Sequence, residues 1–106
     1  MVHQIATLDE FKEKVIAGSN GKLVVVDFWA TWCPPCLMIA PKFVALSEEE
    51  TGVQFYKVDV DDADEVAAFV EISCMPTFKF YKNGELVDTL EGASEAKLKE
   101  LVAKHK

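Results

Sequence analysis

The stretch KLVVVDFWATWCPPCLMIAP, residues 22 to 41, decides the fold of this chain. Its first eight residues are almost all β-branched, aromatic or otherwise apolar, which is typical of a strand buried on both faces at the centre of a parallel sheet. The segment 34–50 then predicts a helix, kinked at Pro41. Cys33 and Cys36 therefore follow the carboxyl end of a central strand, where ligand sites of such sheets lie.

Capping and turn signals place the remaining elements. Thr7, with a glutamate three residues later, has the pattern of a capping box. Asp61 or Asp62 caps a short helix, and Ser94 caps the last one. Asn83-Gly84 is a hairpin signal. The predicted elements are, in chain order, helix 7–18 closed by Gly18, strand 22–29, helix 34–50, strand 53–60, helix 61–70, strands 77–82 and 85–92, and a final helix that buries Leu98, Leu101 and Val102.

The order of these elements predicts an α/β fold. We expect the order β-α-β-α-β-α-β-β-α, although the pattern gives the first strand no bounds. Alternation of strands and helices implies parallel pairing with right-handed crossovers, and the hairpin adds an antiparallel edge. The expected architecture is a central mixed sheet flanked by helices on both faces. A chain of 106 residues can bury one core, so we expect a single domain over residues 1–106.

Charge and composition exclude several classes of partner. The net charge is −7 and the sequence contains no arginine, so we expect no binding to the phosphates of nucleic acids. The apolar runs are far shorter than a membrane span. Residues 1–14 carry charges where a signal peptide needs an apolar stretch. We therefore expect a cytoplasmic protein that does not bind membranes.

Three interpretations compete for Cys33 and Cys36. In the first, a cysteine just before a helix has its thiolate stabilised by free N–H groups, and its partner closes a reversible disulfide on it. In the second, the pair is half of a zinc site, but no second pair of ligands follows. In the third, it is a structural disulfide, which a reducing compartment disfavours. The redox interpretation is favoured, with no metal expected.

The prolines between the cysteines sharpen the redox interpretation. Pro34 falls at the first helical position, where the missing N–H has no intrahelical partner to lose. With Pro35 next, two potential donors near the Cys33 sulfur are absent. The N–H of Cys36 is then the predicted donor at the capping position.

Beyond these local patterns, the sequence resembles the thioredoxin family. The block VVDFWATWCPPCLMIAPKF is similar to the redox-site block of that family, and the similarity continues through KVDVDD and MPTFKFYKNGE to LEGASEAKL. The segment Cys74–Thr77 is most similar to animal-type cytosolic thioredoxins. The chain departs from the usual pattern in its Pro-Pro spacer, where Gly-Pro is usual, and in Leu37, where a basic residue is usual.

The resemblance implies a thioredoxin fold and assigns catalytic roles. It makes Cys33 the attacking thiolate, Cys36 the resolving thiol, and Asp27 the carboxylate that helps Cys36 lose its proton. Sequence alone leaves open that Asp27 is a strand-edge carboxylate with a structural hydrogen bond. Lys57 matches a lysine next to that aspartate, and it could equally be a strand lysine that reaches solvent.

The resemblance also implies a surface that binds substrate. It assigns Trp32 and Pro35 to contacts with the client, makes Pro76 a cis proline beside the cysteines, and leaves the backbone of Met75 free to pair with an extended client segment. Gly92 borders the same groove. From sequence alone, Trp32 also fits core packing, Pro76 a trans proline and Gly92 an ordinary turn.

Four further residues complete the assignments. Pro34 is a supporting residue of the redox site. Cys74 is either a regulatory thiol near the site or a small, semi-buried residue without a role. His3 and His105, near the termini, are given no function.

The function implied is that of a protein-disulfide reductase with no bound cofactor. Its partners are client proteins with disulfides and an NADPH-dependent thioredoxin reductase that supplies electrons. A monomer is expected, with a Cys74-linked dimer as the other possibility. The alternative functions are a thiol oxidase or isomerase, and a non-catalytic thioredoxin-like binding subunit.

Overall fold

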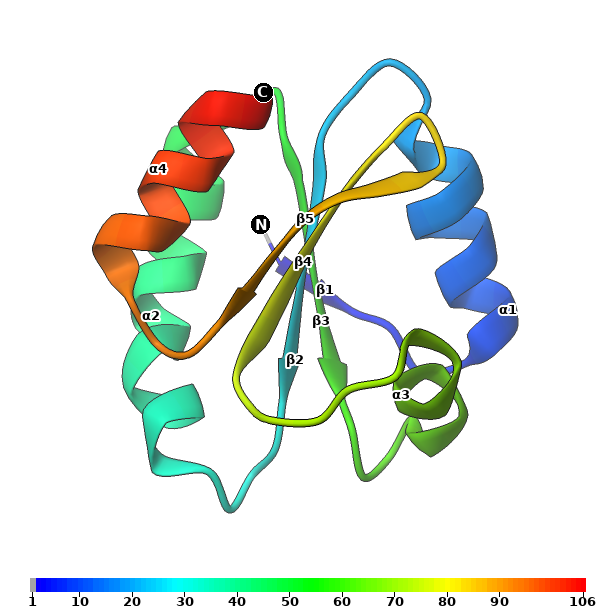
Figure 1. Ribbon diagram of the computed structural model, residues 1–106, viewed down its shortest axis with the longest axis vertical. Coiled ribbons are helices and arrows are strands. Elements are labelled where there is room, and N and C mark those ends of the chain that lie inside the picture. Colours follow the sequence, from blue (N-terminus) through cyan, green and yellow to red (C-terminus); the bar gives the residue numbers. More distant parts are fainter. Residues whose placement is uncertain (1) are drawn as a thin grey trace.

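The computed structural model describes residues 2–106 and is built on a five-stranded mixed sheet (Figure 1). The strands lie side by side in the order β1-β3-β2-β4-β5. β2 pairs in parallel with β3, which pairs in parallel with β1, whereas β4 is antiparallel to both β2 and β5. The strands are β1 Val2–Gln4, β2 Val24–Trp29, β3 Gln54–Asp59, β4 Thr77–Lys82 and β5 Glu85–Glu91.

Helices cover both faces of this sheet. α1 and α3 lie over one face, and α2 and α4 lie over the other (Figure 1). The helical elements are α1 Leu8–Phe11, a wide π-helical turn Lys12–Ile16, a 3₁₀ turn Ala17–Ser19, α2 Pro34–Glu49, α3 Asp64–Val70 and α4 Glu95–His105. The arrangement confirms the predicted mixed sheet between two helical layers and the predicted order of elements.

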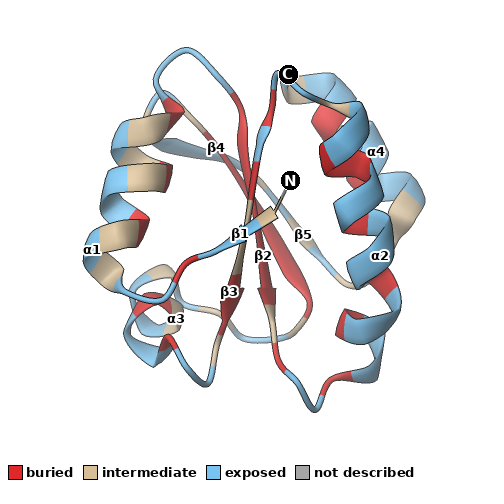
Figure 2. Cartoon of the chain, turned by 180° about the vertical axis from the view of Figure 1, so that it is seen from behind, coloured by how far each residue is buried: buried red, intermediate tan, exposed pale blue. Residues whose placement is uncertain are grey.

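The strand β2 supplies side chains to both cores. Successive side chains of a strand point to opposite faces. Val24, Val26 and Phe28 accordingly pack with α1 and α3, whereas Val25 packs with α2 and α4. Figure 2 shows that buried residues gather on the central strands and on the inward sides of the helices. Asp27 shares its face with Val25, so it lies on the side of the sheet that α2 covers.

The first helix differs from its prediction at the carboxyl end. Thr7 caps it as expected, since its hydroxyl accepts from the N–H of Glu10 at 3.1 Å. The Glu10 carboxylate reaches the N–H of Ala6 and not that of the cap, so only half of the capping box forms. Gly18 is not the left-handed residue that ends the helix, because it lies inside the 3₁₀ turn; the positive φ of 77° belongs to Gly21.

The predicted caps of α3 are wrong. Neither Asp61 nor Asp62 caps the helix, whose N-cap is Ala63. Instead, Asp59 at the end of β3 accepts hydrogen bonds from the N–H groups of Asp61 and Asp62, at 3.0 and 3.4 Å. This carboxylate closes a local turn. Asp61 and Asp62 belong to that turn, and the helix begins after it, at Asp64. The predicted cap of α4 is confirmed, since Ser94 accepts from the N–H of Lys97.

The β4–β5 hairpin turns at Asn83-Gly84, as predicted. Both residues have positive φ, 54° and 77°, which a two-residue turn between twisted strands requires. The turn is anchored by the buried Ser19, whose carbonyl accepts from the N–H of Asn83 at 2.7 Å and whose hydroxyl accepts from the N–H of Gly84 at 2.8 Å. Segments more than sixty residues apart are thus joined at the end of the sheet opposite α3.

Substituting Ser19 by alanine should lower the free energy of unfolding by about 1 kcal/mol, because the part-buried N–H of Gly84 in the hairpin loses its acceptor. Ser73→Ala is the matched control, since its exposed hydroxyl makes only a 3.5 Å contact with Glu91, and it should change stability by at most about 0.5 kcal/mol. Urea unfolding curves of both variants measure the difference. Equal stability of the two variants would contradict the anchoring role of Ser19.

Candidate redox site

The topology brings four segments together at one end of the sheet. β2 ends at Trp29 and leads through a short loop into the amino terminus of α2. Since β4 runs antiparallel to β2, with Phe28 opposite Thr77, the residues before β4 lie at the same end. The loop after β5 joins them, because the N–H of Gly92 donates to the carbonyl of Pro76 at 2.9 Å. The two cysteines therefore face two loops that are distant in sequence.

Cys33 and Cys36 form a disulfide at the start of α2, with Cα atoms 5.3 Å apart. Cys33 is the N-cap of the helix, and its Sγ accepts from the N–H of Cys36 at 3.3 Å. This confirms the predicted donor, since Pro34 and Pro35 fill the first two helical positions and have no N–H to offer. Both cysteines are buried, with exposed fractions of 5% and 1%. The sulfur of Cys33 thus lies at the positive end of the helix dipole.

The zinc interpretation gains no support from the arrangement of the side chains. Within residues 2–106 there is no group of three or more His, Cys, Asp or Glu side chains that could hold a metal ion.

Asp27 is buried directly beneath this helix. Its exposed fraction is 3%, and its Oδ1 has no hydrogen-bond partner among residues 2–106. Burial disfavours the charged form of a carboxyl group and raises the pKa of Asp27 to about 7, against which the positive charge of Lys57 acts. A strand-edge carboxylate held by a structural hydrogen bond is therefore not what the structure contains.

A small pocket of about 200 Å³ joins Asp27 to Cys36. Both residues line it, together with Trp29, Leu37, Ala40 and Lys57. Lys57 is the register partner of Asp27 on β3, and its Nζ lies 5.4 Å from the centre of the Trp29 ring. A carboxyl group with a pKa near neutrality and the sulfur of Cys36 thus line one sheltered space, an arrangement that allows proton transfer once Cys36 is a thiol.

Trp32 stands at the surface, with 63% of its area exposed. Its Nε1 donates to the carboxylate of Asp61 at 2.7 Å, so the indole is held in place although it is not packed in the core. Sequence reasoning missed this role of Asp61, which it had assigned to a helix cap. A hydrogen bond across 29 residues leaves no local signal in the sequence.

The segment before β4 carries the predicted cis bond between Met75 and Pro76. Met75 packs against the cluster formed by the two cysteines and Ala30. Neither its N–H nor its carbonyl makes a hydrogen bond to another residue in the range 2–106. Gly92, with φ of 110°, adopts a conformation that favours glycine. The residues expected to bind substrate therefore border one another, with Trp32 beside Cys33.

One interpretation of Cys74 predicted a semi-buried residue, whereas the structure shows an exposed one. Cys74 lies in the bend before Pro76, where its carbonyl accepts a hydrogen bond from the Thr77 hydroxyl. The two histidines make hydrogen bonds with carboxylates, His3 with Glu10 and His105 with Asp88, and both lie away from the cysteines in sequence and on other elements.

Comparison with known proteins places the chain in a family. The family model described as Thioredoxin matches residues 2–104. The chain belongs to the thioredoxin family. It is 52% identical to the thioredoxin of Equus caballus over 98 residues, 92% of each chain, and 47% identical to that of Malassezia sympodialis over 106 residues, 98% of each. The X-ray structure of Fasciola hepatica thioredoxin matches with a TM-score of 0.95 at 46% identity, over 98% of this chain and 99% of that one.

Membership of the thioredoxin family agrees with the arrangement of the site. The chain has the thioredoxin fold, and it is a thiol–disulfide oxidoreductase of the thioredoxin type. In the part of the chain that the structure describes, no helix is long and apolar enough to cross a membrane.

Replacing Asp27 by asparagine should stabilise the protein above neutral pH. A carboxyl group whose pKa rises from 3.8 to about 7 on folding keeps its proton in the folded state where the unfolded chain has lost it, so stability falls as pH rises through this window. Between pH 5 and pH 8 this loss of stability in the wild type corresponds to about 3 kcal/mol. Urea unfolding at pH 5 and pH 8 should show Asp27→Asn gaining over wild type as pH rises.

The control for this prediction is Asp62→Asn, since Asp62 is exposed. Its stability should follow that of wild type at both pH values. A pH-independent difference between Asp27→Asn and wild type would show that the carboxyl group ionises normally in the folded protein.

Proposed function

We propose that this protein reduces disulfides of client proteins, with Cys33 as the attacking thiolate and Cys36 as the resolving thiol. The observation that supports this most directly is the disulfide at the helix start, where the Cys33 sulfur already accepts a backbone N–H. The same N–H would stabilise a thiolate once the bond is reduced. As a cytoplasmic protein, as we further propose, it would work mainly from the dithiol form.

The first step is attack on the client. The Cys33 thiolate attacks one sulfur of the client disulfide, the client S–S bond breaks, and the second client sulfur leaves as a thiolate that takes a proton from water. A mixed disulfide now links Cys33 to the client. Trp32, Pro35, Met75, Pro76 and Gly92 are proposed to hold the client segment, with the free backbone groups of Met75 pairing with it as an added strand.

The second step releases the client. Asp27, as carboxylate, accepts the proton of the Cys36 thiol in their shared pocket, and Lys57 stabilises the charged form of Asp27. The Cys36 thiolate then attacks Cys33 Sγ, and the client sulfur leaves as a thiolate. The client has gained two electrons, and the protein holds the Cys33–Cys36 disulfide. Both electrons travel on sulfur, so the step needs no cofactor.

Turnover requires a source of electrons and a partner that supplies them. We propose that an NADPH-dependent thioredoxin reductase restores the dithiol. The monomer carries the whole site, and Cys74, being exposed, is the proposed regulatory thiol and the position of any intermolecular disulfide. Pro34 supports the site by fixing the backbone at the start of α2.

The division of labour between the cysteines is tested by single substitutions. Cys36→Ser should accumulate mixed disulfides with a protein substrate such as insulin, because the client can no longer be released, whereas Cys33→Ser should lose insulin reduction entirely. Non-reducing gels and turbidity of reduced insulin measure these outcomes. Cys74→Ser is the matched control and should retain full activity. Wild-type turnover by either of the first two variants would overturn the mechanism.

The spacer should set the acidity of the attacking thiol. Side chains at an N-cap accept from the N–H of the second or third helical residue, and Pro35 removes the first of these donors. Pro35→Ala restores it and should lower the Cys33 pKa, which shifts the equilibrium with glutathione toward the dithiol. Ultraviolet absorbance of the thiolate across pH measures the change. Pro34→Ala is the control, and a Cys33 pKa equal to that of Pro35→Ala would contradict the assignment of the donor.

A further inference from the structure

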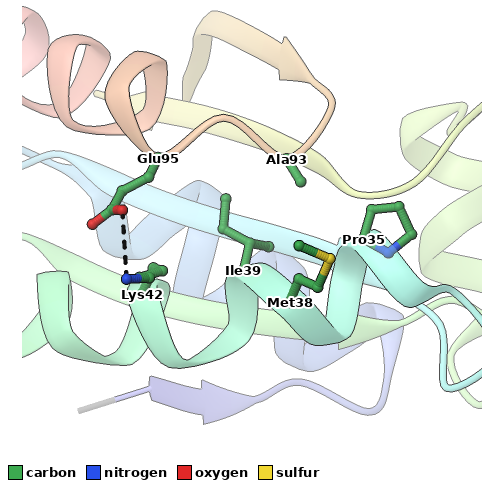
Figure 3. Close-up of a pocket in the computed structure, with 6 residues that line it drawn as sticks. All are labelled: Pro35, Met38, Ile39, Lys42, Ala93 and Glu95. Atoms are coloured by element: carbon green, nitrogen blue, oxygen red, sulfur yellow. Dashed lines mark ion pairs between the residues drawn. The ribbon is translucent and has the colours of Figure 1, made fainter.

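A groove of about 390 Å³ extends from the proline spacer along α2 toward α4 (Figure 3). α2 supplies four of its lining residues, and the segment that follows β5 supplies the other two. The lining residues are Pro35, Met38, Ile39, Lys42, Ala93 and Glu95. Because Pro35 is part of the CPPC motif and Ala93 follows Gly92, the groove is continuous with the redox site.

The end of the groove next to the cysteines is apolar. Figure 3 shows the side chains of Met38 and Ile39 and the ring of Pro35 bordering the space below Ala93. Met38 is 75% exposed, so folding of this chain leaves most of it in water. An unbranched thioether adapts to side chains of different shape, and covering it with an apolar client side chain would stabilise a complex.

The far end of the groove is lined by one lysine and one glutamate, and a second lysine lies beside that glutamate. Lys42 lies 3.8 Å from a carboxylate oxygen of Glu95, the pair drawn with a dashed line in Figure 3. The same carboxylate also pairs with Lys99 at 3.3 Å. One carboxylate is therefore shared between two ammonium groups, on a chain whose net charge is −7. An exposed and long ion pair contributes little stability, so Lys42 can turn to another anion at little cost.

We infer that this groove binds the client residues next to the attacked disulfide and selects an apolar side chain followed by a carboxylate. The apolar side chain covers Met38, and the carboxylate pairs with Lys42. From Pro35 to Lys42 the helix advances about 10 Å, which about three residues of extended peptide span. The selected client thus has a large apolar residue beside its cysteine and an acidic residue about three positions further on. This inference rests on the proposed reduction of client disulfides.

Symmetric disulfide-linked dimers of short peptides test this preference. One peptide carries Phe next to its cysteine and Glu three positions beyond that Phe. A second peptide has Ser in place of Phe, and a third has Lys in place of Glu. Each sequence is made in both chain directions. The measurement is the second-order rate constant for oxidation of the reduced protein. In at least one direction, the Phe and Glu peptide should react about tenfold faster than each of the others, equivalent to about 1.4 kcal/mol. The advantage of Glu over Lys should shrink as salt is added, because the ion pair is exposed.

Variants locate the two preferences. Lys42→Glu should reverse the preference between Glu and Lys peptides, and Met38→Ser should remove the preference for Phe. Val44→Ser, an exposed position on the same helix outside the groove, and Lys104→Glu, in the last turn of α4, should keep the wild-type pattern. Loss of a preference in these controls, or its retention in Lys42→Glu or Met38→Ser, would overturn the inference.

The reaction with 2-hydroxyethyl disulfide separates this inference from the proposed function, since that compound has no side chain to enter the groove. If wild type fails to reduce it, the proposed chemistry fails. If wild type reduces it and reacts with all peptides at one rate in both chain directions, the chemistry stands and the groove selects nothing.

Discussion

The position of β2 between β3 and β4 is the constraint on which the redox end depends. Hydrogen bonds on both sides fix the direction and register of this strand, so its last residues can only leave the sheet at one end. The same register sets Lys57 beside Asp27 and the start of β4 beside Phe28. Since α2 begins immediately afterwards, the disulfide, the buried carboxyl group and the cis-proline loop are all located by the pairing of one strand.

At Asp27 this arrangement lowers the stability of the folded protein and provides a group that can exchange a proton. Oδ1 of this carboxyl group has no hydrogen-bond partner within residues 2–106, so the group destabilises the folded state whenever it is charged. The two apolar cores, one on each face of the sheet, offset this cost. In return, the group takes up and releases a proton near neutral pH, which suits the role proposed for it toward the thiol of Cys36. The positive charge of Lys57 lowers the pKa of Asp27, against the effect of burial, and so favours the charged form of the carboxyl group.

Much of this structure could be predicted from the sequence, because the relevant signals are local. The apolar run of β2, the Asn83-Gly84 turn and the Ser94 cap each act through neighbouring residues, and all three are present. The errors in the predicted helix caps arise where a side chain bonds to residues other than those predicted from the local pattern. Asp61 and Asp62 were predicted to cap α3, but both lie in a turn that the carboxylate of Asp59 closes.

Part of the site was also beyond sequence patterns. The buried state of Asp27 could be expected from its place in an apolar strand. That its Oδ1 has no partner in the described part of the chain depends on what surrounds it in space. The groove beside Pro35 combines a helix face with a loop more than fifty residues later in the chain. No periodic pattern in the sequence predicts that these two segments lie side by side. Local chemistry at the cysteines was thus predictable, whereas the shape of the surface around them required the fold.

The hydrogen bond between Trp32 and Asp61 has a consequence for the surface beside the cysteines. It joins the loop after β2 to the turn after β3 and holds a largely exposed indole at the redox end of the sheet. Any molecule that covers this ring meets a side chain whose position is already fixed, so the contact costs little side-chain conformational entropy.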